Sequence, residues 1–294
     1  MSAAAAARAG YRRDLVSDAL RVWGVLVYLF LFLPIVVIVI YSFNNGRTIL
    51  TFDGVGLESY RSGITDPTIL DAVKTSIVVA AGTALIATVL GTLAGIALAR
   101  RSGKWTVAFM ALIFLILVTP EIVVAISLLI WYVRLGGPFG PTATIPAVSY
   151  GIIRLWVGHS LFATAVVTLI VRARLSGVEE SLEEAAADLY ASPWNRFRQI
   201  TLPLMLPAVL AGALLAFAFS LDDTIISSFV SVAGSTPWPV YVFSAVRNAL
   251  RPEVASISTL LLLLTLVAIA CVLIVLRRSG GSNEEVAKTF AGAG

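Results

Sequence analysis

Six long apolar runs divide the chain, and shorter polar segments separate them. Each run is close to the roughly 20 residues that a helix needs to cross the hydrocarbon core of a bilayer. Backbone polar groups in lipid must bond internally, so we expect each run to be an α-helix. The runs are Val22–Phe43, Thr75–Ala99, Trp105–Val133, Leu155–Val171, Leu202–Ser231 and Val254–Leu276. This pattern predicts an all-α membrane protein with six transmembrane helices.

Composition excludes a soluble globular protein. The 294 residues are 59% hydrophobic and only 13% charged, whereas soluble domains carry roughly 25% charged residues. The basic residues lie beside the apolar runs, which is typical of membrane topology and gives no support to a nucleic-acid partner. The lone His159 has no Cys or His neighbours, so we expect no metal site. Cys271 is the single cysteine, so no disulfide can form within the chain.

The distribution of basic residues predicts the orientation of the chain. Two thirds of the 21 Lys and Arg residues fall on the side that holds both termini. The remaining third falls on the other side, at Arg47, Arg61, Lys74, Arg134, Arg154, Arg247 and Arg251. Because positive loops stay inside, both termini are expected to be cytoplasmic. The predicted organisation is a cytoplasmic tail over residues 1–21, a transmembrane domain over 22–278 with a cytoplasmic loop at 172–203, and a second cytoplasmic tail over 279–294.

Three acidic residues interrupt the apolar runs. Glu121 follows Pro120 in the third run, and Asp222 and Asp223 lie in the fifth. Ionisable groups at membrane depth are costly and are functional candidates by default. Structural alternatives stay open: a packing kink at Pro120 with Glu121 bonded to a neighbouring helix, and a cap at a helix break for the aspartates. Adjacent helical residues point ~100° apart, so we expect one aspartate to face a cavity and the other a neighbouring helix or a partner subunit.

A polar segment between the fourth and fifth runs carries an ordered motif. Glu184-Ala185-Ala186 is followed at a fixed distance by Ile200-Thr201-Leu202-Pro203. Ser192 before Pro193 predicts the start of a short helix, because Ser is a good N-cap and Pro a good first residue. A solvated connector is the simplest reading of such a loop, but a connector needs neither this length nor this order.

This spacing resembles the cytoplasmic loop by which permeases of ATP-binding-cassette (ABC) importers dock on their ATPase. The resemblance implies docking roles for Glu184, Ala185, Ala186, Tyr190, Ile200, Leu202 and Pro203. One position departs from the family pattern, since Tyr190 stands where the family has Gly. A bulky residue rarely adopts a positive φ. We therefore expect an ordinary right-handed backbone at Tyr190, with its ring packed on the loop or on the ATPase.

Three further stretches are similar to the second permease subunit of bacterial spermidine/putrescine importers: residues 120–129, 220–230 and 252–254. The resemblance implies a type I importer fold in the inner membrane. It also implies a heterodimer with a second permease, two ATPase subunits and an extracytoplasmic binding protein. No phosphate-binding loop is present in the sequence. We therefore expect no enzyme activity and no cofactor in this chain, with ATP and Mg²⁺ bound by the partner ATPase.

A polyamine path needs acidic groups and aromatic faces, because cation–π contacts stabilise amines. Glu121, Asp222 and Asp223 supply the acid, and the candidate faces are Trp131, Tyr132, Trp156 and Phe219. Most of these aromatic residues also fit a role as interfacial anchors or packing.

Other functions remain open at the level of sequence. One alternative is an importer of another organic solute, because related permeases carry such solutes. A secondary transporter would use Glu121 or Asp222 as an ion site, but it has no reason to carry the loop from Glu184 to Pro203. A membrane-embedded assembly or signalling subunit would not need carboxyl groups at membrane depth.

Overall fold

The computed structural model describes residues 3–134, 149–178, 181–248 and 251–278, and within these ranges the regular structure is helical. Two compact units are present. The first comprises residues 1–65 and 249–261, and the second comprises residues 66–248 and 262–294. The predicted cytoplasmic tail at 279–294 lies outside the described residues.

The first unit contains α1 (Ala3–Tyr41), α2 (Glu58–Thr65) and the start of α12 (Pro252–Arg278). The loop between α1 and α2 is organised by Asn44, which is fully buried. The Asn44 amide donates to the carbonyl of Thr51 at 2.7 Å, and its side-chain oxygen accepts from the amide of Asp53 at 2.9 Å. One short polar side chain therefore satisfies the backbone groups of a loop that forms no regular ladder.

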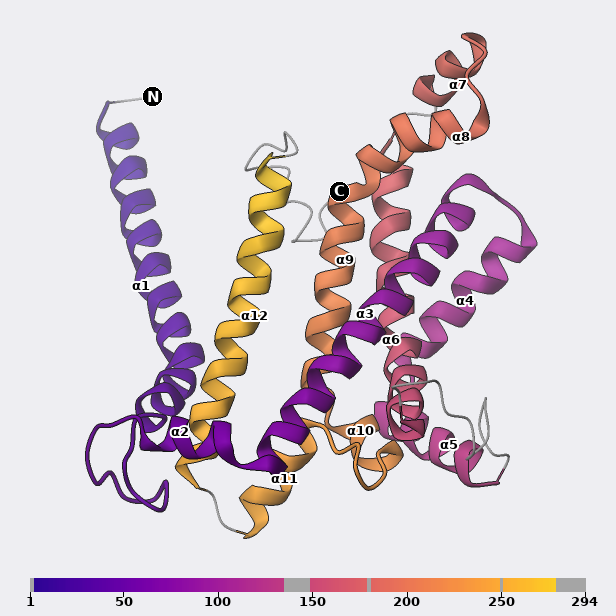
Figure 1. Cartoon of the computed structure of the whole chain (residues 1–294). Coiled ribbons are helices and arrows are strands. Elements are labelled where there is room, and N and C mark those ends of the chain that lie inside the picture. The colour runs from indigo at the N-terminus through magenta and orange to yellow at the C-terminus, as the bar shows by residue number, and fades with distance from the viewer. Residues whose placement is uncertain (1–2, 135–148, 179–180, 249–250, 279–294) are drawn as a thin grey trace. The chain divides into compact units, whose positions relative to one another are not determined.

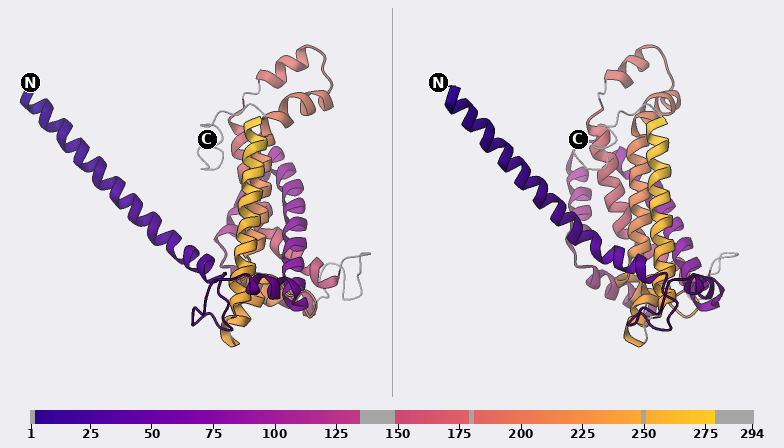
Figure 2. Two further views of the ribbon diagram at one scale, coloured as in Figure 1. Left: turned by 60° about the vertical axis from the view of Figure 1, so that its left-hand side comes forward. Right: turned by 90° about the vertical axis from the view of Figure 1, so that its left-hand side faces the viewer.

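The second unit is built on a bundle of α3 (Pro67–Arg100), α6 (Tyr150–Ser176) and α9 (Leu202–Asp222), which pack on one another (Figures 1 and 2). Small residues set the distance between these helices. A Cβ atom added at Gly91 would lie 2.7 Å from the Cβ of Val167, and one added at Gly95 would lie 2.9 Å from that of Val171. Glycine at these positions lets two transmembrane helices approach closely.

Four of the six predicted runs form single long helices. The helices that are long and apolar enough to span are Val16–Tyr41, Pro67–Arg100, Tyr150–Ser176, Pro193–Asp222 and Pro252–Val275. Four of these contain the predicted runs 1, 2, 4 and 6, apart from one or two terminal residues. These four confirm that the apolar runs form helices.

The third and fifth runs were wrongly predicted as continuous helices. The third consists of α4 (Lys104–Val118) and α5 (Glu121–Arg134), which meet at an angle of 101°. Pro120 causes this elbow, because it lacks an amide hydrogen and disfavours helical backbone at the residue before it. Thr119 is indeed extended, with φ −63° and ψ 128°.

The fifth run ends early. Helix α9 stops at Asp222, and a new short helix, α10 (Ile225–Val230), follows after two residues. Asp223 has an extended backbone, with φ −63° and ψ 105°. Helix α10 packs on α5 and α6, so the broken segment turns back onto the bundle. Helix α11 (Trp238–Asn248) follows it and packs on α3.

Candidate functional site

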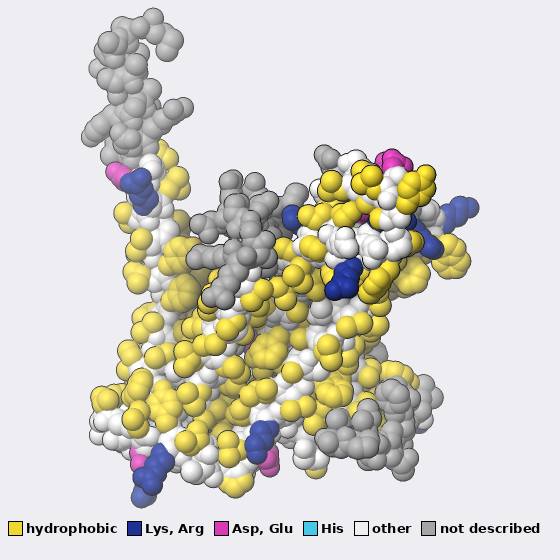
Figure 3. All heavy atoms as spheres, turned by 45° about the horizontal axis from the view of Figure 1, so that its top comes forward, with side chains coloured by type: hydrophobic (Ala, Val, Ile, Leu, Met, Phe, Trp, Pro, Cys, Tyr) yellow, Lys and Arg dark blue, Asp and Glu magenta, His cyan; other side chains and the backbone are white. Residues whose placement is uncertain are grey.

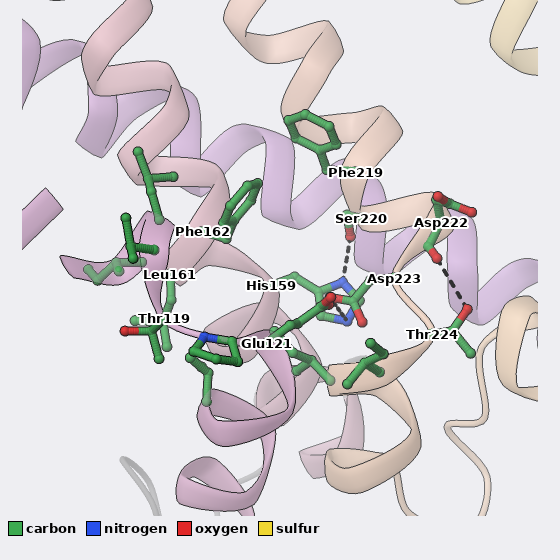
Figure 4. Close-up of a pocket in the computed structure, with 17 residues that line it drawn as sticks. Thr119, Glu121, His159, Leu161, Phe162, Phe219, Ser220, Asp222, Asp223 and Thr224 are labelled. Carbon is green, nitrogen blue, oxygen red and sulfur yellow. Dashed lines mark hydrogen bonds and ion pairs between the residues drawn. The ribbon is translucent and has the colours of Figure 1, made fainter. Parts of the chain in front are cut away.

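The two helix breaks meet at one cavity of ≈ 720 Å³ (Figure 4). Five helices line it: α4, α5, α6, α9 and α10. Non-helical backbone at membrane depth is tolerated only where protein buries it or where it lines a wet cavity. The polar and aromatic lining residues are Thr119, Glu121, His159, Phe162, Phe219, Ser220, Asp222, Asp223 and Thr224. No Lys or Arg is among the described residues that line the cavity.

All three carboxyl groups predicted from the sequence lie at this cavity. Two of them are free: the side chains of Glu121 and Asp222 have no hydrogen-bond or ion-pair partner within the described part of the chain, and both residues are exposed. Asp223 differs, because its Oδ1 accepts from the amide of Ser227 at 3.2 Å. Its Oδ2 lies 3.7 Å from Nε2 of His159. Asp223 thus stabilises the break, whereas the carboxyl groups of Glu121 and Asp222 are unpaired within the described part of the chain.

Of the four predicted aromatic faces, only Phe219 lines the cavity. Its ring meets that of Phe162 edge-on, with the centroids 5.6 Å apart (Figure 4). The sequence reasoning missed Phe162. The two rings give the cavity an apolar aromatic wall close to its carboxyl groups.

Trp131, Tyr132 and Trp156 are not among the residues that line the cavity, and they belong to a packed core instead. The Tyr132 hydroxyl donates to the carbonyl of Arg154 at 2.9 Å, and the Arg154 guanidinium lies 4.6 Å from the Tyr132 ring centre. Trp156 donates through Nε1 to the carbonyl of Val78 at 3.1 Å. These three residues stabilise helix packing in this chain, and their predicted place on the substrate path stays a prediction.

His159 is the lining residue that the sequence analysis considered only as a metal ligand. It comes from α6 and is buried, with Nδ1 2.7 Å from Oγ of Ser220 and Nε2 3.0 Å from Oγ of Ser227. Its own position in the sequence carries no signal, but the sequence spacing of its partners gives an indirect one. Ser220, Asp223 and Ser227 are spaced three and four residues apart, a spacing that would place them on one face of a continuous helix. A polar stripe in an apolar run needs a polar partner on a neighbouring helix.

The predicted cytoplasmic loop forms α7 (Ser181–Asp188) and α8 (Pro193–Arg196), followed by a π-helical turn at Phe197–Thr201 that leads into α9. The predicted cap is confirmed, since the Ser192 side chain accepts from the amide of Asn195 at 3.3 Å. Hydrophobic, basic and acidic side chains lie close together on this loop (Figure 3). Leu189 is 82% exposed and Trp194 is 65% exposed.

The residues assigned to docking are unevenly exposed. Those on the surface are Glu184, Ala185, Tyr190 and Pro203, and those that are half-buried are Ala186, Ile200 and Leu202. The loop therefore presents a short charged and apolar surface, and the second half of the motif anchors it to the bundle.

The prediction of a right-handed backbone at Tyr190 with its ring packed on the loop was wrong. Its φ is +59° and its side chain is 98% exposed, so it has the left-handed backbone of the family's Gly and an unpacked ring. Hydrogen bonds explain the conformation. The amide of Tyr190 donates to the carbonyl of Ala187 at 2.9 Å, and that of Ala191 donates to Ala186 at 3.0 Å. These two bonds form a Schellman cap, which requires a left-handed residue after the helix end.

Glu183, the neighbour of Glu184, connects the loop to the bundle. Its Oε1 accepts from Arg100 Nη2 at 2.6 Å and from the Thr201 hydroxyl at 2.8 Å. Arg100 is the last residue of α3, and Thr201 ends the π-helical turn. One carboxylate thus joins α7 to both α3 and the start of α9. A second bond nearby runs from Arg174 Nε to the carbonyl of Leu204 at 3.1 Å.

Curated proteins of similar sequence are polyamine permeases. The chain is 37% identical over 245 residues to the putrescine transport system permease protein PotI of Escherichia coli K12, covering 82% of this chain and 85% of that protein. It is 34% identical over 253 residues to the spermidine/putrescine transport system permease protein PotC of Haemophilus influenzae, covering 86% and 94%.

Solved structures with the same fold are ABC transporters. A bacterial transporter that imports the acidic polysaccharide alginate matches with a TM-score of 0.68 at 14% identity, covering 91% of this chain and 96% of that one. The methionine transporter MetNI matches with a TM-score of 0.57 at 16% identity, covering 73% and 99%. At such identities the likeness shows the fold alone.

A family model assigns the chain directly. Residues 87–279 match the binding-protein-dependent transport system inner membrane component. This range includes the elbow, the cavity, the loop and the broken fifth run. The chain therefore belongs to the family of inner membrane components of binding-protein-dependent transport systems, and it is a multi-pass permease with the fold of ABC importers.

Proposed function

We propose that this permease passes polyamines such as putrescine and spermidine through the cavity at its two helix breaks. The observation that carries the proposal is the pair of free carboxyl groups, Glu121 and Asp222, at a cavity with no basic lining residue among those described. A charged group at membrane depth costs at least ~2.5 kcal/mol on insertion scales. Water in the cavity offsets this cost between transport events, and a passing ammonium group offsets it during them.

The shape and composition of the cavity support a small organic cation. Its ≈ 720 Å³ falls in the ordinary range of small-molecule sites. Polyamines carry ammonium groups on an apolar chain, and Phe162 and Phe219 offer ring faces for both parts. The acidic cavity does not suit an anionic cargo, although a transporter of acidic alginate has the same fold.

The proposal includes the remaining parts of an importer. A second permease forms a heterodimer with this chain and completes the path. An extracytoplasmic binding protein delivers the solute, and two ATPase subunits bind ATP and Mg²⁺. The loop of α7 and α8 docks on the ATPase through Glu184, Ala185 and the exposed Tyr190 and Trp194. Its mixture of charge and exposed apolar side chains is typical of an interface rather than of a solvated connector.

Uptake assays with neutral isosteres test the path. Cells that lack their own polyamine uptake receive the complete importer, and uptake of labelled putrescine and spermidine is measured. Asn or Gln keeps the size and hydrogen bonding of the acid but removes its charge. We expect Asp222→Asn and Glu121→Gln to lower uptake roughly tenfold, which corresponds to about 1.4 kcal/mol of lost interaction.

Asp223→Asn is the matched variant. The amide oxygen of Asn still accepts from Ser227, so the break keeps its hydrogen bond and uptake falls less than in the other two variants. Complex assembly and basal ATPase activity persist in all three. Normal uptake in every variant would show that these carboxyl groups are structural and that the polyamine path is wrong, while membership of the family would stand. Ligand carried by the purified binding protein identifies the solute independently.

Docking is tested by a charge placed on the face of α7. Ala186 belongs to the docking motif on this helix, and a long basic side chain there is expected to separate the permease from the ATPase. We expect Ala186→Arg to leave the permease complex in the membrane and to abolish the stimulation of ATP hydrolysis by loaded binding protein. Ala187→Arg, on the next and exposed position, serves as the control. Unchanged stimulation in Ala186→Arg would contradict the docking assignment.

A further inference from the structure

The break between α9 and α10 is held by an imidazole from a third helix. His159 of α6 lies between Ser220 on α9 and Ser227 on α10, at 2.7 Å and 3.0 Å from their hydroxyl oxygens. Figure 4 shows the contact with Ser220. All three residues are buried. The break itself carries Asp222 and Asp223. His159 therefore bridges the segment that presents these carboxyl groups.

Chemistry favours histidine for such a bridge. A neutral imidazole donates through one nitrogen and accepts through the other, and a serine hydroxyl adapts to either role. The two ring nitrogens lie on one rigid plane, so the ring fixes the positions of both hydroxyls. No charge is needed for this role. The same network reaches Asp223, whose Oδ1 accepts from the amide of Ser227.

We propose that His159 is the positioning residue of the translocation cavity, which locks the α9–α10 break and so directs Asp222 toward the solute. The role of His159 in transport rests on the proposed function, whereas its role in holding the α9–α10 break does not. Without the bridge, the end of α9 and the start of α10 move independently, and the short segment between them loses its defined geometry. The free carboxyl group of Asp222 is then presented in several positions.

The first test measures the geometry of the break without any substrate. Asp222→Cys is made in a Cys271→Ser background, and the assembled complex reacts with a cationic methanethiosulfonate reagent. His159→Phe, which removes both hydrogen bonds, is expected to change the labelling rate at position 222 by about two- to tenfold, the range for loss of a buried hydrogen bond. His159→Asn and His159→Gln each restore a polar group near one ring nitrogen, and an intermediate rate is expected.

Ser160→Ala is the matched control. Ser160 is the next residue of α6 and is also buried, but its hydroxyl has no hydrogen-bond partner within the described part of the chain. Its removal leaves the labelling rate unchanged. If His159→Phe does not assemble, Ser220→Ala and Ser227→Ala remove the same two bonds with smaller changes. An unchanged rate in His159→Phe, or in both serine variants, would overturn the proposal, as would an equal change in Ser160→Ala.

The second test separates the lock from the polyamine assignment. Uptake of putrescine is measured in the His159 variants with Asp222 intact. A loss of uptake that is partly rescued in His159→Gln or His159→Asn, with basal ATPase activity preserved, supports positioning. Normal uptake in His159→Phe together with an altered labelling rate overturns the role in transport. If Asp222→Asn transports normally, the polyamine path fails, and the labelling experiment still decides whether His159 holds the break.

Discussion

Tyr190 shows how far backbone geometry can override residue type. The left-handed conformation is imposed by the two hydrogen bonds that close α7, although a Cβ atom there costs about 1–2 kcal/mol. Residue type predicted a right-handed turn, whereas the position in the family motif predicted a glycine-like turn. The motif was the better guide, because a Schellman cap depends on hydrogen bonds that a solvent-exposed ring does not disturb.

Replacing Tyr190 by Gly should stabilise the loop. The change removes the strain of the left-handed backbone, which costs about 1–2 kcal/mol. Glycine also loses more conformational entropy on folding, which costs roughly 0.5–1 kcal/mol. The loop is therefore expected to be more stable by about 0.5–1 kcal/mol. Hydrogen exchange of the amides at 190 and 191, which close the cap, should slow about two- to fivefold. Tyr190→Ala keeps the Cβ atom and should leave the exchange near its original rate. Faster exchange in the Gly variant would contradict the strain argument.

The sequence also located the three carboxyl groups that meet at the cavity and predicted different surroundings for the two aspartates, but not which of them is free. Asp222 and Asp223 are adjacent and chemically identical, and only the end of α9 between them separates a free group from a bonded one. His159 was harder to find. A single histidine in an apolar run carries no signal of its own, and the spacing of the polar residues in the fifth run indicates a polar partner without identifying it. Only the placement of α6 against α9 and α10 shows that the partner is His159.

At the scale of elements, periodicity predicted where helices exist but not where they break. Apolar composition continues through residues 118–126 and 221–231, apart from the acidic residues and their neighbours. Pro120 marked the first break, yet proline also occurs inside helices here, as Pro34 does in α1 and Pro207 in α9. No proline or glycine marks the second break. There the local cap from Asp223 and the bridge from His159 replace the lost helical bonds, and the bridge is a tertiary feature that the sequence does not show.

Two adjacent glutamates on α7 should have separable roles. Glu183 is bonded to Arg100 and Thr201 within the permease, whereas Glu184 is exposed and has no partner within the described part of the chain. Glu183→Gln keeps an acceptor for Thr201 but removes the ion pair with α3. We expect this variant to retain the ATPase on purification while uptake per ATP hydrolysed falls. Glu184→Gln should instead weaken retention of the ATPase.

A charge exchange provides the control for this mechanical link. Arg100→Glu alone places two acids together and should uncouple the importer, whereas Arg100→Glu combined with Glu183→Arg restores an ion pair of reversed polarity. Partial recovery of uptake per ATP in the double variant supports the link, because charge-assisted hydrogen bonds are worth about 1.5–3 kcal/mol. Loss of the ATPase in Glu183→Gln to the same degree as in Glu184→Gln would refute the distinction.

At the scale of the whole molecule, the predicted orientation in the membrane decides whether the loop of α7 and α8 can reach a cytoplasmic ATPase. The Arg100–Glu183 pair places the α3–α4 turn at the same end of the bundle as α7. Arg101 and Lys104 lie in or beside that turn, and Arg196 and Arg198 lie in the loop. This end of the second unit is thus rich in basic residues, and the positive-inside rule assigns it to the cytoplasm.

Reporter fusions test this orientation. A green fluorescent protein joined after residue 278 should fluoresce, because it folds in the cytoplasm and the chain end is predicted to lie there. Alkaline phosphatase joined within the α1–α2 loop, after Arg47, should be active, because it folds only outside. Phosphatase joined after Gly103, in the α3–α4 turn, should be inactive and is the internal control.

The reverse activities would place the loop of α7 and α8 on the outer face, out of reach of any cytoplasmic ATPase. The proposal that this loop docks on an ATPase would then be wrong, even though the loop carries the family motif. The cavity depends on contacts within the bundle and would keep its geometry in either orientation, so the outcome decides how transport is powered and not where the solute passes.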